Sequence, residues 1–124
     1  MNVLGIGIDA TDIPRIGSAF ERYGERFLRR VFTDGEIAYC TQRRNPVPHL
    51  AGRFAAKEAL LKALAVPEGL SWHELEVVRE PGAPPRLELS GEAARAAERK
   101  GATRVHLSLT HAGGQAAAMV VLEG

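Results

Sequence analysis

The longest apolar stretch of the chain, residues 51–64, has the composition and spacing of a buried helix. It is rich in Ala and Leu, the strongest helix formers. We expect the helix to begin after Pro46 and Pro48 and to be stopped by Pro67. At about 100° per residue, the bulky residues share one stripe and small residues cover the opposite side, so the helix is apolar nearly all round and should be buried. The bulky stripe comprises Leu50, Phe54, Leu61 and Leu64, and the small side Ala51, Gly52, Ala55, Ala56, Ala59 and Ala63.

Alternation of apolar and polar residues predicts a first strand over residues 3–9. Leu4, Ile6 and Ile8 fall on one face, whereas Gly5, Gly7 and Asp9 fall on the other. Bare glycines on the face of Asp9 leave room for a ligand or for the small side of the helix over residues 51–64.

Caps, turns and further alternation predict the remaining elements. Helices should begin at Asp12, at the Thr33–Glu36 capping box and at Ser90, with Gly24 interrupting the first and Gly101 ending the last. Strands are expected around residues 75–77, 87–89, 105–111 and 115–122, joined in pairs by turns at 80–84 and 112–114. The order β-α-α-α-β-β-α-β-β predicts an α+β fold in which an antiparallel sheet packs around the long buried helix, in a single domain over residues 1–124.

Four charged residues interrupt the apolar helix, and charges are rarely buried without partners. Glu58 and Lys62 are spaced i,i+4, which suits either an exposed ion pair or a functional pair at the edge of a cleft. Lys57 lies within the bulky stripe, so its ammonium must either reach the cleft or pair with an acid. The fourth charged residue is Arg53. Asp9, at a strand end, is by itself more typical of a cap or turn residue than of a ligand.

Composition narrows the possible functions. A chain of 124 residues with a net charge of +1 does not favour general nucleic-acid binding. The single cysteine, Cys40, excludes an internal disulfide and fits a reducing compartment. Residues 1–8 lack the features of a signal peptide, and no apolar run is long enough to span a membrane, so we expect a cytoplasmic protein with no membrane partner. Arginines concentrate between Arg15 and Arg44, either as a solvated face or as a docking surface for an acidic partner.

Carboxylates are the candidate metal ligands in this sequence. No Cys and His spacing is typical of a zinc site, whereas Asp9 and Glu58 suit a hard cation such as Mg²⁺. His111 ends a predicted strand beside a glycine turn, where side chains can reach ligands, whereas His106 lies mid-strand and is more typical of a structural residue.

Three stretches, in this order and in a chain of this length, closely resemble the holo-(acyl carrier protein) synthase family, the short type of phosphopantetheinyl transferase. They are Gly5-Ile-Gly-Ile-Asp9 with Ile13-Pro-Arg-Ile16, the run from Leu50 to Ala59 with Lys62, and Val105–His111 followed by Ala116–Ala118. The resemblance implies transfer of phosphopantetheine from coenzyme A to a serine of apo acyl carrier protein in fatty-acid biosynthesis, with Mg²⁺ as cofactor. It implies release of adenosine 3',5'-bisphosphate, and a homotrimer with active sites between subunits.

The same resemblance assigns roles to individual residues. It implies that Asp9 and Glu58 bind the metal, that Glu58 is the candidate base, and that Lys62 offsets charge on the leaving phosphate. The implied nucleotide contacts are Arg53, Lys57, Lys62 and His111 at the phosphates, with the turn from Gly82 to Pro84 near the adenosine. The implied carrier contacts are Arg15, Arg22 and Arg26, with Phe27 as an apolar anchor.

One departure concerns the nucleotide side of the site. Residues 112–114, Ala-Gly-Gly, are smaller than the bulkier, more polar loop common in the family. Two other interpretations are a non-catalytic coenzyme A or nucleotide-binding module and a purely structural oligomerisation domain. Asp9, Glu58 and Lys62 favour the enzyme, because neither alternative needs a metal pair beside a lysine.

Overall fold

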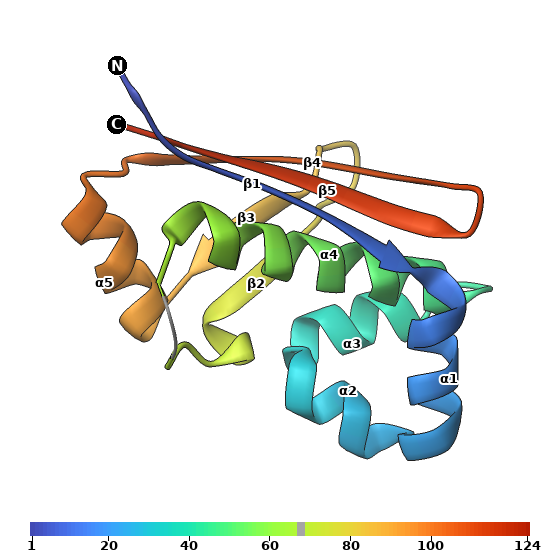
Figure 1. The fold of residues 1–124 in the computed structure, drawn as a ribbon. Helices are drawn as coiled ribbons and strands as arrows, with labels where there is room; N and C mark the ends of the chain where they lie inside the picture. Colours follow the sequence, from blue (N-terminus) through green and yellow to red (C-terminus); the bar gives the residue numbers. More distant parts are fainter. Residues whose placement is uncertain (67–68) are drawn as a thin grey trace.

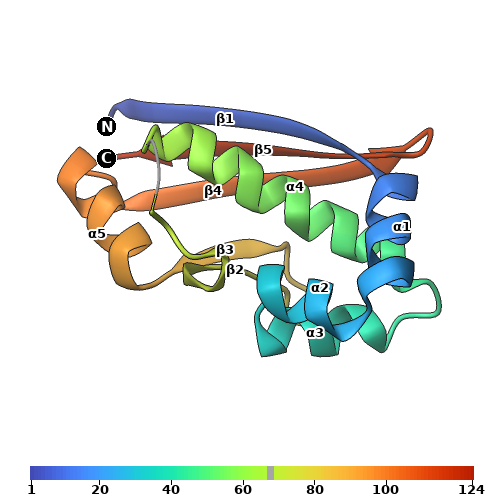
Figure 2. The same ribbon diagram turned by 60° about the horizontal axis from the view of Figure 1, so that its bottom comes forward.

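A long helix, α4 (Pro46–Leu64), lies between two antiparallel sheets (Figures 1 and 2). The computed structural model describes residues 1–66 and 69–124. The larger sheet has the order β1-β5-β4, formed by β1 (Val3–Asp12), β5 (Gln115–Glu123) and β4 (Arg104–Ala112), and the smaller one pairs β2 (Leu75–Val78) with β3 (Arg86–Leu89). Helices α1 (Ile13–Tyr23), α2 (Glu25–Val31) and α3 (Asp34–Thr41) gather near the start of α4, and α5 (Gly91–Lys100) lies near its end.

The predicted α+β fold with an antiparallel sheet and a long helix is confirmed, but several details of the prediction are wrong. The strands form two sheets, and an unpredicted helix, α2, follows Gly24, which has a φ of 55°. The first strand extends to Asp12. Helix α4 begins at Pro46 because the first turn of a helix needs no amide donors and therefore tolerates proline. The predicted stop at Pro67 lies outside the described residues; α4 ends with Ala65 in the left-handed conformation.

Close contact between β1 and α4 sets the geometry of the centre of the protein. A Cβ atom at Gly7 would overlap the carbonyl oxygen of Ala59, and one at Gly5 would overlap that of Ala63. Of the two alternatives for the glycine face, packing on the small side of the helix is therefore the one that the fold adopts. Ile6 and Ile8 lie on the outer face of the sheet and remain exposed.

Two apolar clusters form the core. One lies where α4 and α5 pack on the two sheets, and the other joins α1, α2 and α3 to the first half of α4. Phe32 and Cys40 are fully buried in the second cluster, and the predicted Thr33–Glu36 capping box is present at the start of α3. Within residues 1–66 and 69–124, no helix combines the length and apolar character needed to cross a membrane.

Candidate active site

Asp9 and Lys62 meet where β1 crosses α4. The Lys62 ammonium lies 3.3 Å from Asp9 Oδ1 and donates a 2.9 Å hydrogen bond to the Ile8 carbonyl oxygen. The Thr11 hydroxyl donates a 2.8 Å hydrogen bond to the other Asp9 oxygen, Oδ2. Because the glycines before Asp9 allow β1 to approach the helix backbone, these contacts follow directly from the β1–α4 packing.

Glu58 and Asp9 line one cavity of about 330 Å³, which we call the carboxylate cavity. Burial raises the pKa of Glu58, and the negative charge of Asp9 raises it further, whereas Lys62 and Arg15 oppose the shift. Two carboxylates close enough to repel each other supply oxygen atoms of the kind that a hard cation such as Mg²⁺ prefers. The other residues that line the cavity include Thr11, Arg15, Phe27 and Phe54.

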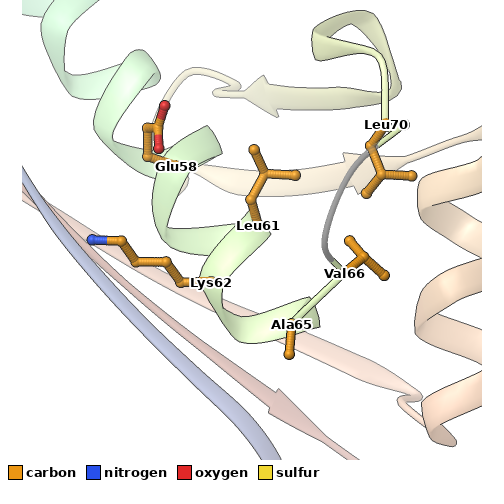
Figure 3. A pocket seen from close by; sticks show the side chains of 7 residues that line it. Glu58, Leu61, Lys62, Ala65, Val66 and Leu70 are labelled. Carbon is orange, nitrogen blue, oxygen red and sulfur yellow. The ribbon is translucent and has the colours of Figure 1, made fainter.

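Glu58 also borders a second cavity, of about 360 Å³, together with Lys62 (Figure 3). Its remaining walls are mainly apolar and include Leu61, Val66 and Leu70. Glu58 lines both cavities and therefore lies between the carboxylate cavity and an apolar slot, which the sequence pattern did not predict. The chemistry of this junction combines two acids, one ammonium group and space for an extended ligand.

The predicted carrier contacts lie around the carboxylate cavity. Arg15 and Phe27 line it, and Phe27 and Arg26 also line an adjacent cavity of about 450 Å³. The exposed Arg22 side chain lies over the ring of Tyr23, 5.4 Å from its centroid. The structure thus brings Arg15 and Phe27 to the acids and leaves Arg22 on the neighbouring surface of α1.

Arg53 and His111 lie in a different place, a cavity of about 320 Å³ that we call the cationic cavity. Sequence reasoning missed two further basic residues in its wall, His49 and Arg79. Burial lowers the pKa of His49, and nearby positive charges, led by Arg53, lower it further. The electrostatics of this cavity favour an anion.

The cationic and carboxylate cavities lie on different sides of α4. Arg53 and Glu58 are five residues apart, which separates their directions around the helix axis by about 140°. In the described part of the chain, the lining of the cationic cavity shares no residue with the carboxylate cavity. The chain therefore presents the acids and this group of cations on different sides of α4.

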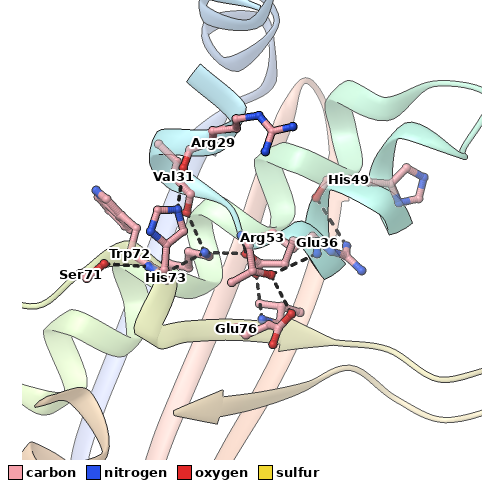
Figure 4. A network of polar contacts seen from close by, with 12 residues as sticks. Arg29, Val31, Glu36, His49, Arg53, Ser71, Trp72, His73 and Glu76 are labelled. Atoms are coloured by element: carbon pink, nitrogen blue, oxygen red, sulfur yellow. Dashed lines mark hydrogen bonds and ion pairs between the residues drawn. The ribbon is translucent and has the colours of Figure 1, made fainter. Parts of the chain in front are cut away.

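Lys57 does not reach either cavity, so the structure does not support its expected role at the nucleotide phosphates. Its side chain is fully buried, and its ammonium forms an ion pair with Glu36 Oε1. Figure 4 labels Glu36 together with Val31 and Trp72 in this polar network. It also donates hydrogen bonds to the carbonyl oxygens of Val31 (2.7 Å) and Trp72 (3.0 Å). Burial lowers the pKa of Lys57, and the Glu36 carboxylate opposes that effect. Of the two possibilities for this residue, pairing with an acid is the one that the fold adopts.

Gly82 and Pro84 are exposed in the turn between β2 and β3. Ala83 closes the turn by donating a 3.1 Å hydrogen bond to the Glu80 carbonyl oxygen. The turn begins just beyond Arg79, which lines the cationic cavity.

No group of three or more His, Cys, Asp or Glu side chains within residues 1–66 and 69–124 is arranged to hold a metal ion. A site built on Asp9 and Glu58 therefore supplies two protein ligands. Mg²⁺ fits such a site, because it is commonly held by one or two carboxylates together with substrate phosphates and water.

Comparisons with known proteins assign the chain to a family. The profile of the 4'-phosphopantetheinyl transferase superfamily matches residues 5–120. The chain is 46% identical over 123 residues to the holo-[acyl-carrier-protein] synthase of Koribacter versatilis, covering 98% of each chain. It is 50% identical over 125 residues to that of Anaeromyxobacter dehalogenans, covering 98% of this chain and 97% of the relative.

Solved structures give the same result. The holo-[acyl-carrier-protein] synthase of Neisseria meningitidis superposes with a TM-score of 0.89 at 30% identity, covering 99% of this chain and all (100%) of the other. That of Helicobacter pylori, in complex with coenzyme A, gives 0.82 at 33% identity and covers 95% of this chain and 99% of the other. The chain therefore belongs to the 4'-phosphopantetheinyl transferase superfamily and, within it, to the holo-[acyl-carrier-protein] synthases. The predicted enzyme class, a transferase of phosphopantetheine from coenzyme A to apo acyl carrier protein, is confirmed.

Proposed function

We propose that Asp9 and Glu58 bind Mg²⁺ together with the diphosphate of coenzyme A during this transfer. The observation that supports the proposal is the shared cavity, in which burial and the charge of Asp9 raise the pKa of Glu58. A bound Mg²⁺ would neutralise charge that develops on the transferring phosphoryl group. The acidic pair, the apolar slot and the carrier surface meet at this point, which supports placing the reaction here.

Glu58 takes the proton from the carrier serine, directly or through a water molecule. A carboxylate whose pKa is raised by burial and by a neighbouring acid is a better base than an ordinary glutamate. The serine oxygen forms a bond to the β-phosphorus of coenzyme A as the bond to the bridging diphosphate oxygen breaks. Adenosine 3',5'-bisphosphate leaves, and Lys62, whose ammonium lies beside Asp9, stabilises the negative charge on it.

The cationic cavity binds the 3'-phosphate of coenzyme A, which is the phosphate that remains once the diphosphate lies beside Asp9 and Glu58. Arg53 and His111 are its predicted contacts, with the Gly82–Pro84 turn towards the adenosine. Because the two cavities face different sides of α4, we infer that the acids of one subunit act on coenzyme A held partly by the cationic cavity of a neighbour. The Helicobacter pylori relative has been solved in complex with coenzyme A, and the Bacillus anthracis relative in complex with coenzyme A (3',5'-ADP).

The subunits assemble as a homotrimer through the outer face of the larger sheet. Ile6, Ile8 and Met119 are exposed there at 60%, 65% and 45%, and the sheet register places Ile8 opposite Met119. Contiguous exposed apolar residues of this size are typical of protein interfaces. This arrangement would cover them and place active sites between subunits.

The acidic acyl carrier protein of fatty-acid biosynthesis docks on α1 and α2. Arg15 and Phe27 border the carboxylate cavity, Arg26 lies in the adjacent cavity, and Arg22 extends the positive surface. Complementary charge would raise the association rate and orient the carrier serine towards Glu58.

Mass spectrometry of the carrier tests the proposal. Incubation of apo carrier with the protein, coenzyme A and Mg²⁺ should add one phosphopantetheine group. The same mixture with a chelator, and a carrier whose acceptor serine is replaced by alanine, should show no addition. A carrier that gains no mass with Mg²⁺ present would overturn the proposed function, and equal gain with the chelator would overturn the metal site.

A further inference from the structure

Tyr39 of α3 lies against two arginine side chains at the edge of the cationic cavity. The Cζ atom of Arg43 is 3.9 Å from the centroid of the Tyr39 ring, and that of Arg53 is 4.1 Å from it. The His49 ring packs edge-on at 6.1 Å. The aromatic ring is thus a shared surface for two cations that would otherwise only repel each other.

Arg53 has few hydrogen-bond partners for a side chain that is only 4% exposed. Its Nη1 atom donates one long bond, 3.5 Å, to the carbonyl oxygen of His49. Its buried Nε atom has no hydrogen-bond partner among residues 1–66 and 69–124. Buried polar groups normally find partners, so a guanidinium group that lines a cavity and makes one long hydrogen bond has donors left for a ligand there.

Stacking on an aromatic ring, unlike ion pairing with an acid, leaves the N–H donors of an arginine available for a ligand. A guanidinium group carries its five N–H donors in its plane, whereas a ring held against its face uses none of them. An acidic partner would have neutralised the charge and occupied those donors. Contact with Tyr39 therefore fixes the orientation of Arg53 and keeps its donors for a phosphate, which accepts bidentate hydrogen bonds from arginine.

We infer that Tyr39 is a positioning residue, which holds Arg53 ready for the 3'-phosphate of coenzyme A and thereby contributes to selectivity for 3'-phosphorylated nucleotides. The inference rests on the proposed binding of that phosphate in the cationic cavity. Arg43, on the same ring, adds positive potential without contacting the ligand. Removing the ring face should weaken binding of the 3'-phosphate about three- to tenfold, the range expected for a partly desolvated cation–π contact.

Calorimetric binding of adenosine 3',5'-bisphosphate and adenosine 5'-monophosphate tests this inference on the whole protein. The wild type should prefer the bisphosphate. Tyr39→Leu should lose about three- to tenfold in affinity for the bisphosphate and less than about twofold for the monophosphate. Tyr39→Phe and Tyr39→Trp, which keep a ring face, should retain the wild-type preference. Tyr39→Gln replaces the leucine variant if that variant does not fold.

Three results would overturn the inference: no preference in the wild type, equal losses for both nucleotides in Tyr39→Leu, or full retention of the preference in that variant. A structural role confined to packing α3 on α4 gives equal losses, because it does not distinguish the ligands. The carrier assay is independent of this one. If the wild type modifies the carrier but binds both nucleotides equally, the inference fails while the proposed function stands.

Discussion

Replacing Lys57 by methionine tests whether this lysine supports the fold or the chemistry. Lys57→Met keeps most of the apolar stem but leaves two buried acceptors, the Glu36 carboxylate and the Val31 carbonyl oxygen, and the partly buried Trp72 carbonyl oxygen without the lysine donor. Glu36 retains only the backbone N–H groups of Thr33 and Val77 as hydrogen-bond donors in the described structure. Removal of one partner from a buried ion pair typically costs about 3–5 kcal/mol, and we expect a loss of this size in the free energy of unfolding.

A second lysine on the same helix is the matched control. The Lys62 side chain is 54% exposed, and its pairing with Asp9 at 3.3 Å should contribute less than about 1 kcal/mol to stability. Lys62→Met should therefore unfold almost like the wild type but lose most of its transfer rate. Lys57→Met should unfold more easily than the wild type. Under conditions in which this variant is folded, its KM for coenzyme A should be close to that of the wild type.

Urea unfolding at one fixed protein concentration measures the stability effect, since the proposed assembly would make apparent stability depend on concentration. The double variant Lys57→Met with Glu36→Gln removes the unpaired charge and should recover about 1–3 kcal/mol relative to Lys57→Met alone. Unchanged unfolding of Lys57→Met together with a raised KM for coenzyme A would refute this reasoning and return Lys57 to the nucleotide site.

Four further substitutions test the site and the assembly. Glu58→Gln should lower transfer at least about 100-fold with an unchanged far-UV spectrum; near-normal turnover would exclude the base and metal assignment. Arg22→Glu should raise the KM for the carrier about three- to tenfold at low salt without changing coenzyme A affinity, and an unchanged KM would indicate a merely solvated arginine. Gly7→Val should destabilise the protein by more than about 3 kcal/mol in urea unfolding, because its side chain would overlap the Ala59 carbonyl; a stable variant would contradict the β1–α4 packing. Ile8→Asp should convert the proposed trimer to monomers in sedimentation analysis, and a trimer that persists in this variant would exclude the outer sheet face as the interface.

The central packing of the fold could be predicted from short stretches of sequence. Gly5 and Gly7 carry no side chains, and the helix face opposite them is lined with alanines, so the strand and helix backbones can pack closely. This close packing brings Asp9 beside Lys62. The capping box at Thr33 was equally predictable because its hydrogen bonds join residues three positions apart. The start of α4 was not predicted correctly. Proline is tolerated in the first turn of a helix and excluded only from its interior, so Pro46 and Pro48 could lie either before the helix or inside its first turn.

Sequence alone therefore determined the family, the packing of β1 on α4 and the order of the elements apart from α2, because these depend on local spacing and on motifs in fixed order. Only the tertiary structure decided which side of α4 each charge serves. Lys57 pairs with Glu36, 21 positions earlier, and Arg53 stacks on Tyr39, 14 positions earlier. Neither pairing follows from a helical period, because each depends on how α3 packs against α4.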